Sequence, residues 1–182
     1  MTSPPFRRYA WPGRAPLPPV ADDPIAHLRA CHARIRDHLA LAHRLTAPDA
    51  AASPASEIAA AGSALARYFG IALPLHVADE EESIRPRLAS GTELGPLLDQ
   101  LGGEHAVIDD LLDELVPRFA ILGAEPARVA ELTPARDDVT WLANLLEAHL
   151  VLEETRLFPE LERLLSPAAR AEILAEQRAR RS

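Results

Sequence analysis

The sequence predicts an all-α protein whose main part is an antiparallel, up-down four-helix bundle. Hydrophobic residues make up 48% of the 182-residue chain but aromatic residues only 4%, so small aliphatic side chains must form the core. Alanine and leucine dominate and glycine is scarce, at 8 residues, which favours helix. Apolar residues also recur at steps of three and four, the spacing of one buried helix face.

Helix starts and stops divide the chain into three parts. Asp22 or Asp23 followed by Pro24 is typical of a helix start, and Ser166–Pro167 repeats that pattern. The expected bundle helices cover about 24–46, 56–85, 93–121 and 134–164, and a last helix runs to about 181. We therefore expect a proline-rich arm (1–22), a four-helix bundle (23–165) and a short extra C-terminal helix (166–182).

Prolines modify this outline. Residues 1–20 hold six of them, which excludes helix there and favours a flexible arm. Pro74 is expected to kink the second helix, and Pro86 and Pro159 to bend or end the second and fourth. Three aromatic residues would, in the alternative, hold the arm against the bundle: Phe6, Tyr9 and Trp11.

The chain repeats itself at an offset of 73 residues. Each repeat is a helical hairpin that carries one histidine on its first helix and a His-x-x-x-Glu motif 44 residues later. One hairpin cannot bury its apolar stripe alone, whereas two facing hairpins form a four-helix bundle. The histidines share their stripes with leucines and isoleucines, so they are expected to point into the core. The repeat thus selects six residues: His32, His76, Glu80, His105, His149 and Glu153.

These six residues are predicted metal ligands. Residues four apart lie on one helix face, so each motif can direct its imidazole and its carboxylate to one site. A buried carboxylate without a partner costs several kcal/mol. Two such carboxylates beside four imidazoles therefore require a cation.

The ligand types indicate which cation. Four nitrogens and two carboxylates exceed what one tetrahedral zinc ion takes, and calcium or magnesium prefers oxygen ligands. Two metals would each receive two histidines and, if both glutamates bridge, two carboxylate oxygens. A bridging oxo or hydroxo group would be the fifth ligand, which leaves a sixth position open. Such sites suit two non-haem iron ions, with manganese or a mixed pair as the alternative.

Charge and cysteine content exclude other classes. The net charge of −8 argues against a nucleic-acid partner, which needs a basic stripe. The single cysteine, Cys31, excludes an internal disulfide and four-cysteine metal sites. The N-terminus has no apolar region of a secretory signal, and no stretch approaches the roughly 20 apolar residues of a membrane span. We therefore expect a cytoplasmic protein without a membrane partner.

Four segments resemble the helices of the hemerythrin-like (HHE) domain: ACHARIRDHL, LHVADEEESIRPRL, GEHAVIDDLL and AHLVLEETRLFPEL. The resemblance covers about 25–165 and implies a four-helix bundle that holds two irons. Oxygen-carrying hemerythrins have a further histidine four residues after the third-helix histidine, where this chain has Asp109. The pattern is closer to members with four histidines and two bridging glutamates, such as iron–sulfur-cluster repair proteins and the hemerythrin domain of an iron-sensing ubiquitin-ligase subunit.

The expected function is that of a di-iron protein that binds or senses dioxygen, nitric oxide or peroxide. If the site is catalytic, the protein is a di-iron oxidoreductase acting on one of these molecules. The alternative is an iron-handling or iron-sensing protein, including a role in iron–sulfur cluster repair, in which metal orders the fold. The arm or the last helix would then bind a protein partner.

Other polar and aromatic residues receive lesser roles. Glu81 and Glu154 are expected to hydrogen-bond a ligand imidazole, with direct metal ligation as the alternative. Among the remaining histidines, His27 and His38 are expected at the surface or helix flank, and His43 could sit at the far end of the core. The last group is expected to pack inside the bundle: Cys31 as an inert thiol, with Tyr68 and Trp141.

Overall fold

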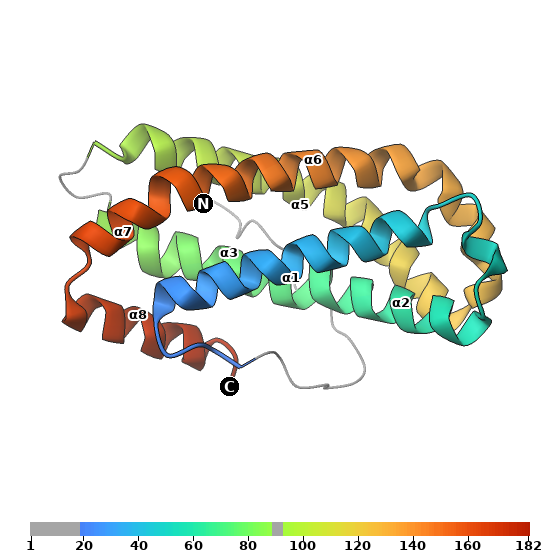
Figure 1. The fold of residues 1–182 in the computed structure, drawn as a ribbon, viewed down its shortest axis with the longest axis horizontal. Helices are drawn as coiled ribbons and strands as arrows, with labels where there is room; N and C mark the ends of the chain where they lie inside the picture. The colour runs from blue at the N-terminus through green and yellow to red at the C-terminus, as the bar shows by residue number, and fades with distance from the viewer. Residues whose placement is uncertain (1–18, 89–92) are drawn as a thin grey trace.

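The computed structural model describes residues 19–88 and 93–182, and in this part of the chain the fold is helical throughout (Figure 1). Four long helical stretches run along one another as a bundle, and a further helix packs at one end (Figure 1). The described residues contain no β-strand, which confirms the predicted all-α class. The predicted arm lies almost entirely at residues 1–18, outside the described residues.

Each long stretch of the bundle corresponds to one expected helix. The first is α1 (Pro24–Leu45), and the third is α5 (Gly95–Ala124). The second consists of α2 (Ala55–Arg67), η2 (Tyr68–Ala72), α3 (Leu73–Ala78), η3 (Asp79–Ile84) and α4 (Arg85–Leu88). The fourth consists of α6 (Arg136–Leu152), η5 (Glu153–Leu157) and α7 (Phe158–Leu164), and α8 (Pro167–Ala179) follows it. Between these stretches lie two 3₁₀ segments, η1 (Ala50–Ala52) and η4 (Pro126–Ala135).

Two of the predicted helix starts are capped as the sequence indicates. The Asp23 carboxylate accepts hydrogen bonds from the backbone N–H groups of Ile25 and Ala26, at 3.0 and 2.9 Å. The Ser166 hydroxyl accepts from the N–H of Ala169 at 3.2 Å. Each side chain satisfies N–H groups that have no partner within the first helical turn, which fixes where α1 and α8 begin.

The prolines of the second and fourth stretches do not end their helices. Instead a π-helical segment precedes each: η2 before Pro74, η3 before Pro86 and η5 before Pro159. Proline removes an N–H and crowds the carbonyl four residues earlier, and the wider π turn relieves that conflict. Of the two expected effects of Pro86 and Pro159, a bend or an end, an end is not found at either proline, since the chain continues as helix to Leu88 and Leu164.

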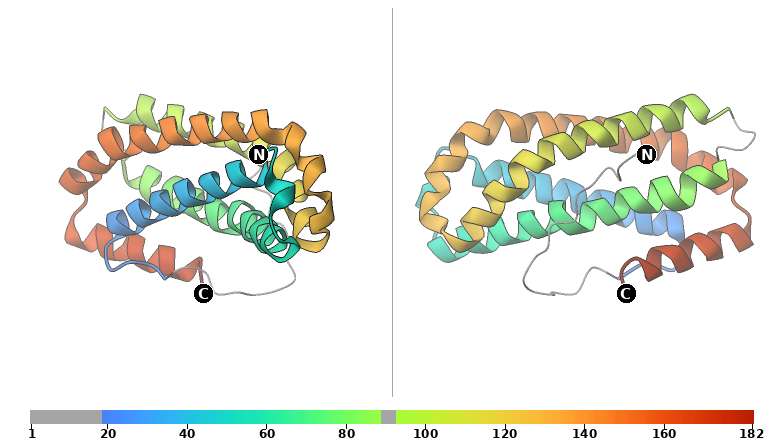
Figure 2. Two further views of the ribbon diagram at one scale, coloured as in Figure 1. Left: turned by 45° about the vertical axis from the view of Figure 1, so that its right-hand side comes forward. Right: turned by 180° about the vertical axis from the view of Figure 1, so that it is seen from behind.

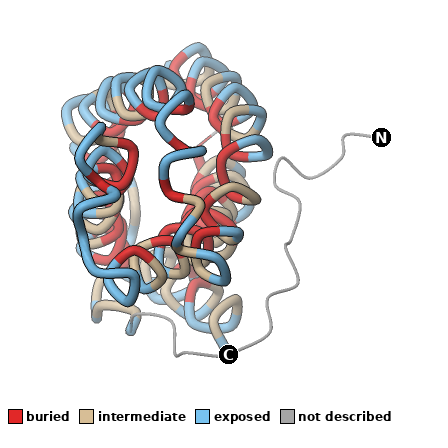
Figure 3. The backbone as a smooth tube through the Cα atoms, turned by 90° about the vertical axis from the view of Figure 1, so that its right-hand side faces the viewer, coloured by how far each residue is buried: buried red, intermediate tan, exposed pale blue. Residues whose placement is uncertain are grey.

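The apolar core is divided in two along the bundle axis. One cluster contains Ile35, Phe69 and Phe119, and the other, towards the opposite end, contains Leu28 and Phe158. Buried positions lie on the inner sides of the helices when the bundle is viewed along its axis (Figure 3). On every long stretch the predicted ligands fall between residues of the two clusters, so polar side chains are enclosed by apolar layers on both sides.

The C-terminal helix α8 lies alongside the start of α1, as both views in Figure 2 show, and packs on η3. Its Ile173 joins the smaller apolar cluster and is fully buried. Arg87, which follows η3, pairs with Glu172 and Glu176 of α8 at 3.3 and 2.8 Å. The predicted extra C-terminal helix is thus packed against the bundle and shares its apolar core.

One helical stretch differs from the expectation about membrane spans. Ala55–Leu88 is 34 residues long and has a window of mean hydropathy 1.4, so by length and composition alone it could cross a membrane. In the structure this stretch supplies Phe69 and Leu73 to the apolar core and Glu80 to its polar layer. The core helix of a bundle passes the same test, so the finding is weak evidence for a span.

Candidate metal centre

The structure brings all six predicted ligands together in the middle of the bundle. They come from six different elements and all are buried: His32 on α1, His76 on α3, Glu80 on η3, His105 on α5, His149 on α6 and Glu153 on η5. Their ligand atoms form two overlapping groups of four, and within each group all atoms lie within 4.8 Å of one another. The first cluster is His32, His76, Glu80 and Glu153, and the second cluster is Glu80, His105, His149 and Glu153.

The two glutamates belong to both clusters, and each turns one oxygen to each cluster. Glu80 places Oε1 3.2 Å from Nε2 of His76 and Oε2 3.3 Å from Nε2 of His105. Glu153 places Oε2 3.1 Å from Nε2 of His32 and Oε1 3.4 Å from Nε2 of His149. This is the arrangement of two carboxylates that can bridge a pair of metal ions.

The inward-facing atoms lack hydrogen-bond partners. Both carboxylate oxygens of Glu80 and of Glu153, and the Nε2 atoms of His32 and His76, are buried without a hydrogen bond among the described residues. In the second cluster the Nε2 atoms of His105 and His149 face each other at 3.1 Å. Buried polar atoms are normally paired, so a set of acceptors that converge without donors fits a bound cation.

Three of the four imidazoles are held from outside by a carboxylate. The Nδ1 atom of His32 lies 2.8 Å from Glu154, and that of His105 lies 3.0 Å from Glu81. Both distances support the prediction that these glutamates hydrogen-bond ligand imidazoles, and neither glutamate is in the two clusters. A carboxylate that accepts the Nδ1 proton fixes the tautomer in which Nε2 has a free lone pair.

The third outer carboxylate, Glu104, was missed by the sequence reasoning. Its Oε2 lies 2.8 Å from Nδ1 of His149. Glu104 is on α5 and His149 on α6, and no spacing within one helix relates them. Only its place directly before His105, in the row of residues that borders the ligand stripe, could have suggested a role.

The two central carboxyl groups, Glu80 and Glu153, have different pKa values because they are buried close together. Burial and the neighbouring charge of Glu153 raise the pKa of Glu80 to about 7. Burial also acts on Glu153, but the neighbouring imidazoles of His149 and His32 outweigh it and hold the pKa of Glu153 below its ordinary value. Near neutral pH the metal-free centre therefore contains both protonated and ionised Glu80, while Glu153 stays ionised.

The pKa values of the imidazoles also differ from one another. Burial opposes the charge of His105, but Glu80 and Glu81 raise its pKa to about 10. His76, in contrast, has its pKa lowered well below the ordinary value by burial and by the neighbouring His32. His105 thus holds a proton that a metal must displace, whereas His76 is already neutral.

Several expectations for other side chains are corrected. His27 is not at the surface: it is buried, 3.7 Å from both Asp79 and the Sγ of Cys31. His38 is half-buried, which agrees with the expected helix flank, and its ring stacks on Tyr68 at 3.7 Å. His43 is exposed instead of lying at the far end of the core. Cys31 and Tyr68 are buried as predicted, whereas Trp141 is 63% exposed and does not pack inside the bundle.

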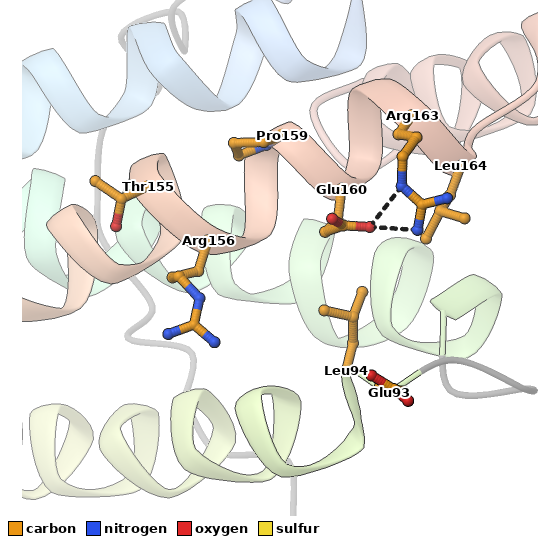
Figure 4. Close-up of a pocket in the computed structure, with 8 residues that line it drawn as sticks. All are labelled: Glu93, Leu94, Thr155, Arg156, Pro159, Glu160, Arg163 and Leu164. Atoms are coloured by element: carbon orange, nitrogen blue, oxygen red, sulfur yellow. Dashed lines mark hydrogen bonds and ion pairs between the residues drawn. The ribbon is translucent and has the colours of Figure 1, made fainter.

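A surface pocket of about 650 Å³ lies between η5–α7 and the start of α5 (Figure 4). Thr155, Arg156 and Glu160 line it from η5 and α7, and Glu93 lines it from the chain before α5. Arg163 closes one side through its hydrogen bonds to Glu160 at 2.6 and 2.9 Å (Figure 4). None of the six clustered residues lines this pocket.

Comparison with known proteins agrees with this geometry. No curated protein that was compared with the chain matches it. The model of the hemerythrin HHE cation-binding domain matches residues 23–161, a span that runs from the N-cap of α1 into α7 and includes all six clustered residues. Because this match covers well over half of the chain, the protein belongs to the hemerythrin HHE cation-binding domain family.

Proposed function

We propose that the protein is a non-haem di-iron protein that binds or senses dioxygen, nitric oxide or peroxide in the core of the bundle. Domains of this family bind metal cations, and the two clusters supply donors for two ions. The His32, His76, His105 and His149 imidazoles would be terminal ligands, and the Glu80 and Glu153 carboxylates would bridge. The iron identity, a bridging oxo or hydroxo group and a cytoplasmic location are parts of this proposal.

One observation carries it: buried acceptor atoms converge on two points without donors. The four carboxylate oxygens of Glu80 and Glu153 have no hydrogen bond among the residues described, although both side chains are at most 5% exposed. Hydrogen-bonded or apolar groups at these positions would be stable without metal, but uncompensated carboxylates would not. Imidazole with carboxylate is a ligand set that suits iron.

The ligand count indicates the chemistry. Two imidazoles and two carboxylate oxygens per ion leave coordination positions unfilled, and iron at such positions supplies a redox-active Lewis acid for a small molecule. The surrounding chain restricts what enters, because apolar side chains such as Leu28, Ile35 and Phe158 border the centre on both sides. A small uncharged ligand or peroxide suits these surroundings better than a large charged one.

A second candidate is favoured by the contacts of α8. Arg180 and Arg181, at the end of this helix, hydrogen-bond Asp79, the residue before Glu80. A metal that orders Glu80 would thereby also order a helix at the surface. The protein would then handle or sense iron, with a role in iron–sulfur cluster repair as one form, and α8 or the arm would contact a protein partner.

Metal analysis and spectra of anaerobically purified protein test the proposal. We expect about two iron ions per chain and an absorption spectrum that changes when dioxygen, nitric oxide or peroxide is added. Metal that only raises thermal stability, with no spectral response, would support the second candidate. Protein that binds no iron or manganese would contradict both.

Matched histidine variants connect the metal to this centre. His76→Ala removes a buried ligand of the first cluster, so its iron content should fall to about half of the wild-type value. His43→Ala removes an exposed histidine of α1 and should leave the iron content unchanged. Equal iron content in the two variants would show that the metal binds elsewhere.

A further inference from the structure

The outer sides of the two clusters are not equivalent. In the second cluster both imidazoles donate to a carboxylate: His105 to Glu81 at 3.0 Å and His149 to Glu104 at 2.8 Å. Such carboxylates fix the ring orientation and make the metal-facing nitrogen a stronger donor. The second cluster therefore offers two strengthened imidazoles to its ion, of which the one at His105 is backed by a carboxylate that also pairs with Arg85 at 3.4 Å.

The first cluster has one such imidazole, and its carboxylate is partly neutralised. His32 lies 2.8 Å from Glu154, but Glu154 also accepts hydrogen bonds from the Arg36 guanidinium at 2.8 and 3.3 Å. Glu104, by comparison, accepts from the neutral amide of Gln100 at 2.8 Å. The negative charge behind His32 is therefore weaker than the charge behind His149.

The other imidazole of the first cluster, His76, has no outer partner. Its Nδ1 is buried without a hydrogen bond to any residue that the structure describes. The internal repeat explains this, because the residue 73 positions before Glu104 is Cys31. Cys31 is a thiol and not a carboxylate, and it faces His27 at 3.7 Å and accepts from Arg34 at 3.1 Å.

The carboxylate nearest to His76 in sequence, that of Asp79, already has other partners. Asp79 accepts hydrogen bonds from Arg180 at 3.0 Å and from Arg181 at 2.7 and 3.1 Å. The positive charges of two guanidinium groups thus offset the negative charge of Asp79, and their hydrogen bonds hold its oxygens towards α8. Asp79 therefore does not replace the missing partner of His76.

We propose that the second cluster binds its metal ion first and releases it last, and that the first cluster is the exchangeable position. This inference rests on the metal centre proposed above. Both ions share the same two carboxylates, so the difference between them must come from the imidazoles. At limiting metal the chain would hold one ion between His105 and His149, and its second ion would enter beside His76.

Cobalt(II) titration of the metal-free protein, followed by release to a chelator, tests this order. We expect two binding steps with affinities at least about tenfold apart, and a fast and a slow release of one ion each. Glu104→Ala should weaken the tighter step about tenfold and speed the slow release. Glu104→Gln, which keeps an acceptor but loses the charge, should fall between Glu104→Ala and the wild type. Glu114→Ala, an exposed glutamate of the same helix, should change neither step.

His76→Ala assigns the two phases to the clusters. This variant should lose the fast-released ion and keep the slow one. A single binding step with single-phase release, or a Glu104→Ala effect on the fast phase alone, would overturn the inference while leaving the metal centre intact. Protein that binds no cobalt would instead contradict the metal centre itself.

Discussion

Three of the four histidines of the centre divide their two ring nitrogens between an inner and an outer carboxylate. Nε2 of His32 faces Glu153 inside the bundle, whereas Nδ1 faces Glu154 on the outside. The same division holds for His105, between Glu80 and Glu81. A carboxylate on the outer nitrogen keeps a proton there, so the inner nitrogen already faces the metal position and can bind once it carries no proton itself.

Proton release should accompany metal binding at the residue level. His105, whose pKa is raised to about 10, and Glu80, whose pKa is raised to about 7, hold protons that must leave before they can ligate. At pH 8 Glu80 is ionised and His105 is still protonated, whereas at pH 6 both are protonated. Metal affinity should therefore rise with pH, about tenfold per unit for each proton released.

Calorimetric titration with cobalt(II) in buffers of different ionisation enthalpy measures these protons directly. More protons should be released at pH 6 than at pH 8, since Glu80 contributes only at the lower pH. The His105 proton should appear at both. An affinity that does not change between these two pH values would show that neither group is protonated in the metal-free protein.

At the scale of elements, the π segments determine how the glutamates meet. Glu80 lies in η3 and Glu153 begins η5, and each segment precedes a proline, Pro86 or Pro159. π turns of this kind are frequent at functional sites. The repeated proline was visible in the sequence, but it suggested a kink or an end to the helix. The π turn that accommodates proline depends on the packing of the whole stretch, which a spacing rule does not contain.

The contact between α8 and η3 should contribute strongly to stability. Asp79 is fully buried, and Arg180 and Arg181 supply most of its hydrogen bonds. Changing both arginines to alanine leaves a buried carboxylate beside only His27, and we expect a loss of about 3 to 5 kcal/mol in the free energy of unfolding. Chemical denaturation of the metal-free protein measures it.

Arg178→Ala is the matched control for this contact. Arg178 lies on the same helix, but its pair with Asp22 is at the surface, where such pairs contribute about 0 to 1 kcal/mol. A double arginine variant as stable as Arg178→Ala would mean that α8 does not stabilise η3 through Asp79.

The approach of α2 to α5 depends on one glycine. A Cβ atom at Gly62 would lie 2.8 Å from the backbone N of Gly123 and 2.8 Å from the carbonyl oxygen of Phe119. Backbone atoms cannot move aside without separating the helices, so Gly62→Ala should destabilise the protein by about 1 to 3 kcal/mol. Gly103→Ala, where no atom lies within 4 Å of the added Cβ, should instead stabilise α5 by about 0.5 to 1 kcal/mol. Thermal unfolding of both variants tests the pair, and equal shifts would contradict the close approach.

At the scale of the whole molecule, the repeat made most of the fold and the six clustered residues predictable. Helical spacing decides whether an imidazole faces the core. The repeat shows this spacing twice, because His32 corresponds to His105 and His76 corresponds to His149. Contacts between distant segments leave no such pattern. The hydrogen bond between Glu104 and His149 does not follow from spacing along one helix, and neither does the hydrogen bond from Arg180 to Asp79. Both depend on how separate helices are oriented.

The centre also links the four long helical stretches, so metal should stabilise the entire bundle. Each stretch contributes at least one of the six clustered residues, and every one of them is buried. An ion that binds the folded chain and not the unfolded one stabilises it by about 2.7 kcal/mol when its free concentration is 100 times the dissociation constant. Iron(II) or cobalt(II) should therefore raise the unfolding temperature, and a chelator should return it to the metal-free value. Glu153→Ala removes the η5 carboxylate that would bridge the two ions, so metal should shift its unfolding temperature by much less than that of the wild type. A shift of equal size in both proteins would mean that the ion stabilises the fold from somewhere other than the bundle centre.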